Sequence, residues 1–294
     1  MDQPRTLSRD ASPAGDRVAY RITPGPPAAD TGVLLLHGLA SNLTRWSEFV
    51  AVTSLAERHP LIRVDLRGHG DSPTRRRIGL ELWSDDLAAL MDAERLRRAI
   101  VVGHSLGAQA ALHFASVHAA RARALVLIDP VFRAALHGKW KRIATCGPLF
   151  ALAAAAVRAL NALGLRRRHV TPLDLQQLDR EARVALADAR SEAAFVRRYS
   201  STRSDLRSFR VAHYLQELVE LFRPLPPPSD YPMPVLVLLS TGATFATLAE
   251  TRALAAGFPR GEIDTIDCHH WPLTERPAEV RARIERWIAA LPPG

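Results

Sequence analysis

One stretch of the chain, residues 99–112, constrains the fold more than any other. It reads AIVVGHSLGAQAAL, so an apolar run is followed by a Gly-x-Ser-x-Gly turn and then by small residues with helical spacing. Glycines on both sides of the serine let a strand and a helix approach closely without side-chain clashes. Such a turn lifts the Ser105 hydroxyl above the sheet, and the following helix N-terminus favours developing negative charge. The stretch therefore predicts a strand, a strained turn carrying a nucleophilic serine, and a helix.

The rest of the chain alternates apolar runs with helical patterns. Residues 17–23 alternate like an edge strand, and residues 262–266 alternate like a last strand near the sheet edge. Buried strands are predicted at 32–36, 61–65, 99–102, 124–128 and 235–239. Helices between them are predicted at 81–96, 106–119, 247–256 and 277–291. This alternation predicts an α/β, doubly wound, mostly parallel sheet with helices on both faces.

The alternation is interrupted once, at residues 131–230. This segment has no strand pattern and reads as helices at 151–163, 173–190, 193–199 and 211–222. It carries 17 Lys and Arg against 9 Asp and Glu, and so holds +8 of the net charge of +9. A charge bias confined to one segment suggests that the segment has its own role. We therefore expect a core of residues 1–130 and 231–294, with a basic helical insertion at 131–230.

Further motifs accompany the serine turn and carry a family resemblance. Residues 34–46 read LLLHGLASNLTRW, residues 64–72 read VDLRGHGDS, and residues 270–275 read HWPLTE. With GHSLG at 103–107, these motifs resemble the landmarks of the α/β-hydrolase superfamily. The resemblance implies the α/β-hydrolase fold, with residues 131–230 as a helical cap, or lid, inserted after the sixth strand of that fold. It also implies an enzyme that uses neither a cofactor nor a metal.

The resemblance assigns backbone groups to an oxyanion hole. The His37-Gly38 turn would point the following amides toward the nucleophile, so that the amides of Leu39 and Leu106 hold the oxyanion. Backbone donors need no particular side chain, so leucine at both positions is acceptable. The loop with Asp65, Arg67, His69 and Asp71 looks catalytic by residue type, but in this superfamily it is mainly structural.

Two adjacent histidines compete for the role of general base. The superfamily usually has Gly-His-aromatic-Pro followed by an acidic residue, and aligning this pattern puts His270 on the base, with Trp271, Pro272 and Glu275 in register. His269 then stands where the glycine is usual and adds a second titratable group near the site. His270 is the prediction, and His269 is the alternative.

The acid that orients the base is missing from its usual place. The superfamily often carries it in a Gly-x-x-Asp turn after the strand at 235–239, but residues 235–247 contain no Asp or Glu. Ser240 stands at the position of the glycine and Ala243 at the position of the acid. Ser240, Thr241 and Thr244 are left near the site, where a carboxylate is otherwise found.

A second position for the acid is available one strand earlier. Asp129 follows the strand at 124–128, and some superfamily members carry the acid there, so Asp129 is the leading candidate. An aspartate at this strand end also occurs with a structural role in relatives whose acid is in the usual place. Asp264 and Asp267 are weaker candidates. A Ser–His dyad and a decayed triad stay open as alternatives.

These residues predict a serine hydrolase for a carboxylic ester, thioester or lactone. Ser105 would attack the acyl carbon, His270 would transfer the proton, and Asp129 would orient the imidazole. Relatives that attack with an aspartate, such as haloalkane dehalogenases and epoxide hydrolases, do not fit Ser105. Two rivals are a non-hydrolytic Ser–His enzyme of the same fold (a lyase, cyclase or acyltransferase) and a non-catalytic ligand-binding or scaffold relative.

The basic insertion bears on the partners. Its most apolar part, residues 148–165, contains Arg158 and Asn161 and is shorter than the ~20 residues that a membrane span needs. Arg166-Arg167-Arg168-His169 follows directly, which favours a cap helix with a solvated basic end. Contact with a membrane surface, or docking of an acidic carrier or a phosphate-bearing substrate, are the sharper alternatives.

Composition narrows the substrate and the compartment. The apolar insertion favours a hydrophobic small-molecule acyl substrate, and the lack of interleaved aromatic residues argues against nucleic acid. The N-terminal residues lack the apolar core of a signal peptide, and Cys146 and Cys268 have no metal-binding spacing. A cytoplasmic protein is expected.

Overall fold

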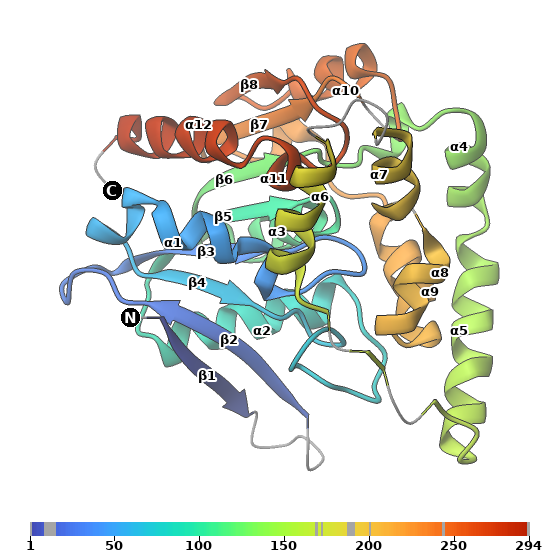
Figure 1. Cartoon of the computed structure of the whole chain (residues 1–294). Helices are drawn as coiled ribbons and strands as arrows, with labels where there is room; N and C mark the ends of the chain where they lie inside the picture. The colour runs from blue at the N-terminus through green and yellow to red at the C-terminus, as the bar shows by residue number, and fades with distance from the viewer. Residues whose placement is uncertain are drawn as a thin grey trace.

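The computed structural model describes residues 2–8, 16–167, 170–171, 173–186, 192–199, 201–242 and 245–292. An eight-stranded sheet with the order β1-β2-β4-β3-β5-β6-β7-β8 lies at the centre (Figure 1). Its strands are β1 (Gln3–Ser8), β2 (Arg17–Thr23), β3 (Thr31–Leu36), β4 (Leu61–Val64), β5 (Arg98–His104), β6 (Ala122–Ile128), β7 (Val235–Ser240) and β8 (Gly261–Ile266). Strands β3 to β8 pair in parallel, whereas β1–β2 and β2–β4 pair antiparallel. The predicted mostly parallel sheet is confirmed.

The sheet has one strand that the sequence did not predict. Strand β1 pairs with β2 along its whole length, and β2 pairs with β4 on its other side. The prediction that residues 17–23 form an edge strand was therefore wrong, because β1 occupies the edge. Strand β1 reads QPRTLS and lacks the apolar alternation by which strands are recognised. At the other end β8 does lie at the edge.

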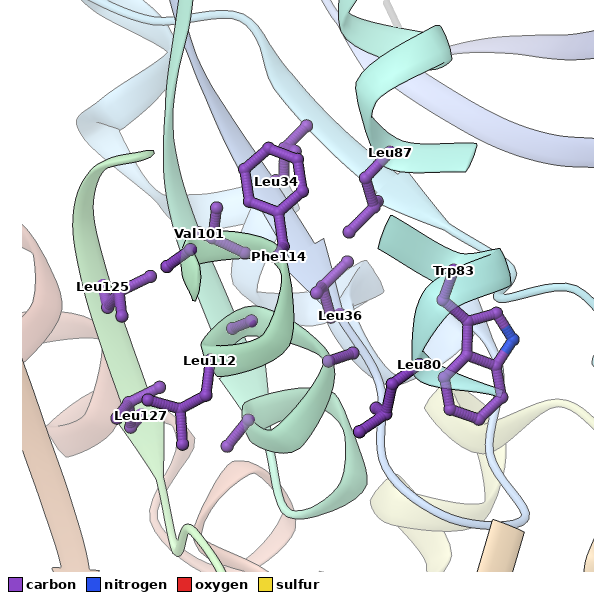
Figure 2. Close-up of a cluster of buried hydrophobic side chains, with 14 of the residues drawn as sticks. Leu34, Leu36, Leu80, Trp83, Leu87, Val101, Leu112, Phe114, Leu125 and Leu127 are labelled. Carbon is purple, nitrogen blue, oxygen red and sulfur yellow. The ribbon is translucent and has the colours of Figure 1, made fainter. Parts of the chain in front are cut away.

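Helices cover both faces of the sheet, because successive strand side chains point to opposite faces. One cluster joins Leu34 and Leu36 to α2 (Leu80–Ala93) and α3 (Leu106–Val117). Figure 2 draws part of this cluster, with Phe114 near Leu34 of the sheet and Trp83 beside Leu80 of α2. On the opposite face a second cluster joins Val33 and Leu35 to α1 (Ser47–Val52) and α12 (Pro277–Ala290). The remaining helices of the core are α10 (Leu248–Ala255) and α11 (Pro272–Glu275).

Between β6 and β7 the described residues form helices and connecting loops. The helices are α4 (Gly138–Thr145), α5 (Gly147–Ala162), α6 (Leu175–Leu186), α7 (Glu192–Tyr199), α8 (Thr202–Ser208) and α9 (Val211–Leu221). Helices α4 and α8 were not predicted. Short 3-10 helices are η1 (Leu43–Trp46), η2 (Ser54–Glu57), η3 (Ala119–Arg121), η4 (Arg133–Ala135) and η6 (Pro228–Asp230). Arg168 and His169 lie outside the described residues.

A buried ion pair joins helix α6 of the insertion to the core. The Arg45 guanidinium of η1 donates to both carboxylate oxygens of Asp179 on α6, at 2.5 and 2.6 Å. The hydroxyls of Tyr199 on α7 and Thr274 on α11 donate to the same carboxylate, at 2.8 and 3.0 Å. Because removing one partner leaves a buried charge unpaired, such a pair fixes how the inserted helices sit on the core.

No single helix in the described part of the chain is both long and apolar enough to cross a bilayer. Helices α4 and α5, bent by 54° at the break between them, meet the criteria of length and composition only when taken together.

The connections of the central strands determine where a site can form. From β3 the chain continues to β4 on one side, whereas β5 lies on the other side of β3. In an open α/β sheet, ligands bind beyond the carboxyl ends of the strands at such a reversal of strand order. The loops after β3, β5, β6 and β7 therefore meet at the place where a site is expected.

Candidate active site

Ser105 occupies a strained turn between β5 and α3. Its φ of 53° is unusual for a residue with a side chain. A Cβ on Gly103 would lie 2.2 Å from the Gly107 carbonyl oxygen, and a Cβ on Gly107 would lie 2.5 Å from that of Leu36. Both flanking positions therefore require glycine, because strand and helix touch there. This is the strand–turn–helix geometry that presents a nucleophilic serine.

The loop after β8 brings His270 to this serine. His270 Nε2 lies 3.1 Å from Ser105 Oγ, within hydrogen-bonding distance. The neighbouring His269 is engaged elsewhere, since its Nδ1 lies 3.0 Å from Glu275 Oε2 and its backbone amide donates to the same oxygen at 3.1 Å. Of the two histidines, the structure brings His270 to Ser105.

The carboxylate of Asp129 faces the other side of the same imidazole. Asp129 Oδ2 lies 3.2 Å from His270 Nδ1. The backbone amide of Ser240 donates to Asp129 Oδ1 at 2.7 Å, and the Ser240 hydroxyl donates to Oδ2 at 2.6 Å. Burial alone would raise the pKa of Asp129, but the hydrogen bond and charge of His270 and the two Ser240 donors outweigh it and lower the pKa below its ordinary value.

The turn after β3 lies directly against Ser105. A Cβ on Gly38 would lie 3.3 Å from the His104 carbonyl oxygen and 3.5 Å from Ser105 Cβ. His37 is fully buried and fixes this turn, because its Nδ1 donates to the Gly38 carbonyl at 2.9 Å and its Nε2 accepts from the Leu66 amide at 3.2 Å. Among the described residues, nothing accepts a hydrogen bond from the amides of Leu39 or Leu106.

An unpredicted contact holds the end of this turn. Glu217 of α9 is completely buried, and its Oε2 accepts a hydrogen bond from the Ala40 amide at 2.9 Å. Ala40 has a φ of 47°, a conformation that costs free energy unless its surroundings hold it. The other carboxylate oxygen of Glu217 lies 3.2 Å from His69 Nε2, and the His69 ring packs edge-on against His37 at 4.7 Å. A helix of the inserted segment therefore reaches the turn beside the serine.

The comparison with protein families agrees with this geometry. A model described as the alpha/beta hydrolase family matches residues 33–283. The chain belongs to the α/β-hydrolase family.

Known relatives of this α/β hydrolase match it over part of the chain. Esterase YbfF of Escherichia coli is 32% identical over 97 residues, which are 33% of this chain and 37% of that protein. Lipase LipV of Mycobacterium tuberculosis is 35% identical over 107 residues, which are 35% of this chain and 39% of that protein. The matches thus span less than half the length of these curated relatives. An esterase from Thermogutta terrifontis has a similar structure, with a TM-score of 0.68, 21% identity and 98% coverage of both chains, which supports the fold.

His104 lies beneath the imidazole of this α/β hydrolase. Its Nε2 donates to the His270 carbonyl at 3.0 Å, and the two ring centroids lie 5.2 Å apart. Burial, followed by the charge of His270, lowers the pKa of His104 to about 3, so this ring is neutral at physiological pH. The sequence did not predict that His104 holds the backbone of His270, because His104 occupies a variable position (x) of the Gly-x-Ser-x-Gly motif.

Within the described residues, one group of side chains could also hold a metal ion, namely His104, Asp129 and His270. Ligand atoms of His104, Asp129 and His270 all lie within 4.8 Å of one another. However, His104 donates to a carbonyl, and Asp129 accepts from Ser240 and faces His270. A metal ion would have to displace these contacts. The arrangement therefore fits proton transfer from serine to imidazole better than metal binding.

The other candidate carboxylates have different partners. Asp264 pairs with Arg283, and Asp267 accepts from the Thr241 hydroxyl at 2.7 Å. Ala243 and Thr244 lie outside the described residues. Ser240, at the end of β7, contacts Asp129 and not His270 directly. Asp129 is thus the candidate acid that the structure brings to His270.

The loop after β4 supports the turn beside Ser105. Asp65 accepts from the amides of Leu43 and Asp71 at 2.7 and 2.8 Å, and burial raises its pKa to about 6. Arg67 donates to both carboxylate oxygens of Asp86, at 2.9 and 2.5 Å. These contacts stay within the fold and give the loop the structural role that its family resemblance implies.

One cavity touches the site, and a second shares part of its lining with the first, although residue Ser105 is only 5% exposed. A cavity of about 30 Å³, room for about one water, touches Asp129, Ser240 and His270. A second, of about 440 Å³, is lined largely by apolar residues, including Leu112, Leu225 and Phe258. Val131 and Phe132 border both cavities.

Proposed function

We propose that this α/β hydrolase is a cofactor-independent serine hydrolase for a carboxylic ester, thioester or lactone. The observation that supports this best is the continuous relay from Ser105 Oγ to His270 Nε2 at 3.1 Å and from His270 Nδ1 to Asp129 Oδ2 at 3.2 Å. A neutral serine is a weak nucleophile and needs a base that is itself oriented by a third group. The relay supplies both.

In the proposed mechanism, Ser105 attacks the acyl carbon while His270 Nε2 takes the hydroxyl proton. The amides of Leu39 and Leu106 would stabilise the resulting oxyanion. His270 then protonates the leaving alkoxide or thiolate, and the ester bond breaks to leave an acyl-Ser105. Water, deprotonated by His270, attacks this acyl group and releases the carboxylic acid. Asp129 holds Nδ1–H and stabilises the imidazolium in both steps.

The substrate that we propose has a hydrophobic acyl group. The cavity of about 440 Å³ is largely apolar, and Val131 and Phe132 separate it from the small cavity at His270. Residues 131–230 would act as the cap, since Ser105 is buried and a substrate needs an opening. Names of the relatives, an esterase and a lipase, also favour ester hydrolysis. Cytoplasmic location is part of the proposal, and both cysteines are free.

A fluorophosphonate probe and p-nitrophenyl esters of increasing chain length test this function. We expect labelling of the wild type, no labelling of Ser105→Ala, and hydrolysis that both Ser105→Ala and His270→Ala abolish. Equal labelling of wild type and Ser105→Ala would refute Ser105 as the nucleophile. Labelling without hydrolysis of any ester would favour a non-hydrolytic Ser–His enzyme, and no labelling at all would favour a ligand-binding relative.

A further inference from the structure

Helix α5 exposes its apolar residues instead of burying them. Leu149, Leu152, Leu160 and Leu163 are 65, 68, 47 and 79% exposed, and they follow one another at helical spacing on one face. The opposite face packs against α9 and includes the partly buried Arg158. Figure 1 shows α5 at the right edge of the molecule, with α9 between it and the core. A helix on the surface of a soluble protein normally turns its apolar face to the core and its polar face to the solvent.

The charge around this apolar face has one sign. Residues 131–167 contain no Asp or Glu. Their basic residues are Arg133, Lys139, Lys141, Arg142, Arg158, Arg166 and Arg167. Three of them precede α5 on α4, and two follow its C-terminal end, so that the leucine row has basic residues at both ends. An apolar stripe flanked by Lys and Arg is typical of helices that lie in a membrane interface.

The dimensions agree with a helix that lies in an interface. Sixteen residues of α5 extend about 24 Å, and Leu165, just beyond the helix, is a further exposed leucine (70% exposed). Helices α4 and α5 are bent by 54° at the break between them. On α4, Lys139 and Lys141 are exposed, whereas Trp140 packs inward against Phe222 and Phe245. Exposed lysines next to an apolar surface favour contact with anionic lipid headgroups.

We propose that α4 and α5 form a docking surface for an anionic lipid bilayer. The leucine row of α5 would enter the boundary of the acyl chains, and the basic residues at its two ends would contact lipid phosphates. A second copy of the chain fits less well, because it would bring two basic surfaces together. An acidic carrier protein would match the charge but would offer little apolar area for five exposed leucines.

Docking would also bear on the candidate active site. Helix α5 packs against α9, and α9 carries Glu217, which binds the Ala40 amide beside Ser105. The bilayer would thus contact the layer of helices that covers the site, which suits a hydrophobic acyl substrate held in lipid. This consequence rests on the proposed function, whereas the docking surface does not.

Flotation of the full chain with vesicles tests the docking surface. We expect binding to vesicles that contain phosphatidylglycerol, weak binding to vesicles of phosphatidylcholine alone, and a loss of binding as salt increases. Leu152→Glu with Leu163→Glu should weaken binding at least about tenfold per leucine. Val52→Glu with Val117→Glu, at residues 58 and 54% exposed on other helices, is the matched control and should bind normally.

Two charge-reversal variants complete the test. Lys139→Glu with Lys141→Glu should reduce binding to the anionic vesicles, whereas Arg252→Glu with Arg260→Glu, exposed on α10 and directly before β8, should not. Equal binding to both kinds of vesicle, equal losses in the control variants, or a dimer that dissociates when the leucines are changed would each overturn the proposal. Hydrolysis of a short soluble ester, measured in parallel, should be unaffected in every one of these variants, so a failure of the esterase assay is separate from a failure of docking.

Discussion

The two sides of the candidate site are held in different ways. On the acid side, Asp129 at the end of β6 is fixed by Ser240 at the end of the adjacent strand β7, through two hydrogen bonds of 2.7 and 2.6 Å. On the side of the proposed oxyanion hole (below, the oxyanion side), the turn after β3 is fixed at Ala40 by Glu217, which belongs to the inserted helix α9. The first contact lies within the sheet, whereas the second joins the core to the insertion.

Because of this difference, the two sides of the site should respond differently when the inserted helices move. Neighbouring strands of a parallel sheet share a dense hydrogen-bonded ladder, so the acid side should stay ordered as long as the core is folded. The oxyanion side depends on how the inserted helices sit, and hence on contacts such as the Arg45–Asp179 pair. A movement of α9 would change the turn beside Ser105 without disturbing Asp129.

The largest effect is expected when the acid side loses its charge. Asp129→Asn should lower kcat by about 10⁴-fold, because a neutral amide no longer stabilises the imidazolium and favours the wrong tautomer. Steady-state hydrolysis of a short p-nitrophenyl ester measures it. Activity within a few fold of wild type would remove Asp129 from the mechanism.

A second substitution tests whether a carboxylate at the end of β7 can replace Asp129 at the end of β6. Ser240 Oγ lies 2.6 Å from Asp129 Oδ2, and Ser240 and His270 line the same small cavity, so a carboxylate at position 240 would bring a negative charge close to the imidazole. Ser240→Asp in the Asp129→Asn background should recover at least about tenfold of the lost kcat. No recovery, with an unchanged melting temperature, would show that only the end of β6 positions the acid correctly.

On the oxyanion side a smaller loss is expected, since Glu217 acts through the backbone. Glu217→Ala should lower kcat by roughly 10- to 100-fold with little change in KM, less than the ~10²–10³ that follows removal of an oxyanion donor itself. Glu217→Gln keeps an acceptor for Ala40 and should retain most activity. Glu220→Gln, also buried on α9 but paired with Arg223, is the control. A fall in melting temperature without a change in kcat would reduce Glu217 to a purely structural role.

A milder change on the acid side is Ser240→Ala. It removes the hydroxyl donor to Asp129 but keeps the backbone donor, so kcat should fall by roughly tenfold. Ser116→Ala, which removes a hydroxyl bonded to the His113 carbonyl far from the site, gives the background effect. An equal change in kcat for Ser240→Ala and Ser116→Ala would contradict the inference that the Ser240 hydroxyl supports Asp129.

The smallest effect concerns pH and stability on the oxyanion side. Burial would lower the pKa of His69, but the negative charge of Glu217, 3.2 Å away, outweighs it and raises the pKa above 6.5. A raised histidine pKa stabilises the fold fully below 6.5, and this contribution is lost as the pH rises through the folded pKa. The difference in melting temperature between wild type and Glu217→Gln should therefore be largest below pH 6.5 and shrink at higher pH. A difference that grows with pH would reverse the assignment.

Much of the fold was predictable from local patterns. The strand, glycine turn and helix at 99–112 have a short-range cause, because Gly103 and Gly107 are required where strand and helix touch. The polar strand β1 was missed because its pairing with β2, and not its own sequence, makes it a strand.

The sequence predicted the parts of the candidate site that depend on residue type within a motif. It did not predict the parts that depend on contacts between residues far apart in the sequence. The proposed roles of Ser105, His270 and Asp129 came from motif positions. Glu217 contacts Ala40 across 177 positions of sequence, and nothing in the local pattern of α9 marks that contact. Helical periodicity likewise predicts that α5 has an apolar face but not that the face points outward, because periodicity does not say what lies on either side.

The contact between Ser240 and Asp129 has an evolutionary consequence. Since side chains at the ends of β6 and β7 touch, a lineage could acquire a second carboxylate at one strand end before it lost the first. If the proposed role of Asp129 holds and a carboxylate at position 240 can replace it, such a sequence of changes would keep an acid beside the imidazole at every step. An alignment of one column alone would then mistake a change of position for a loss.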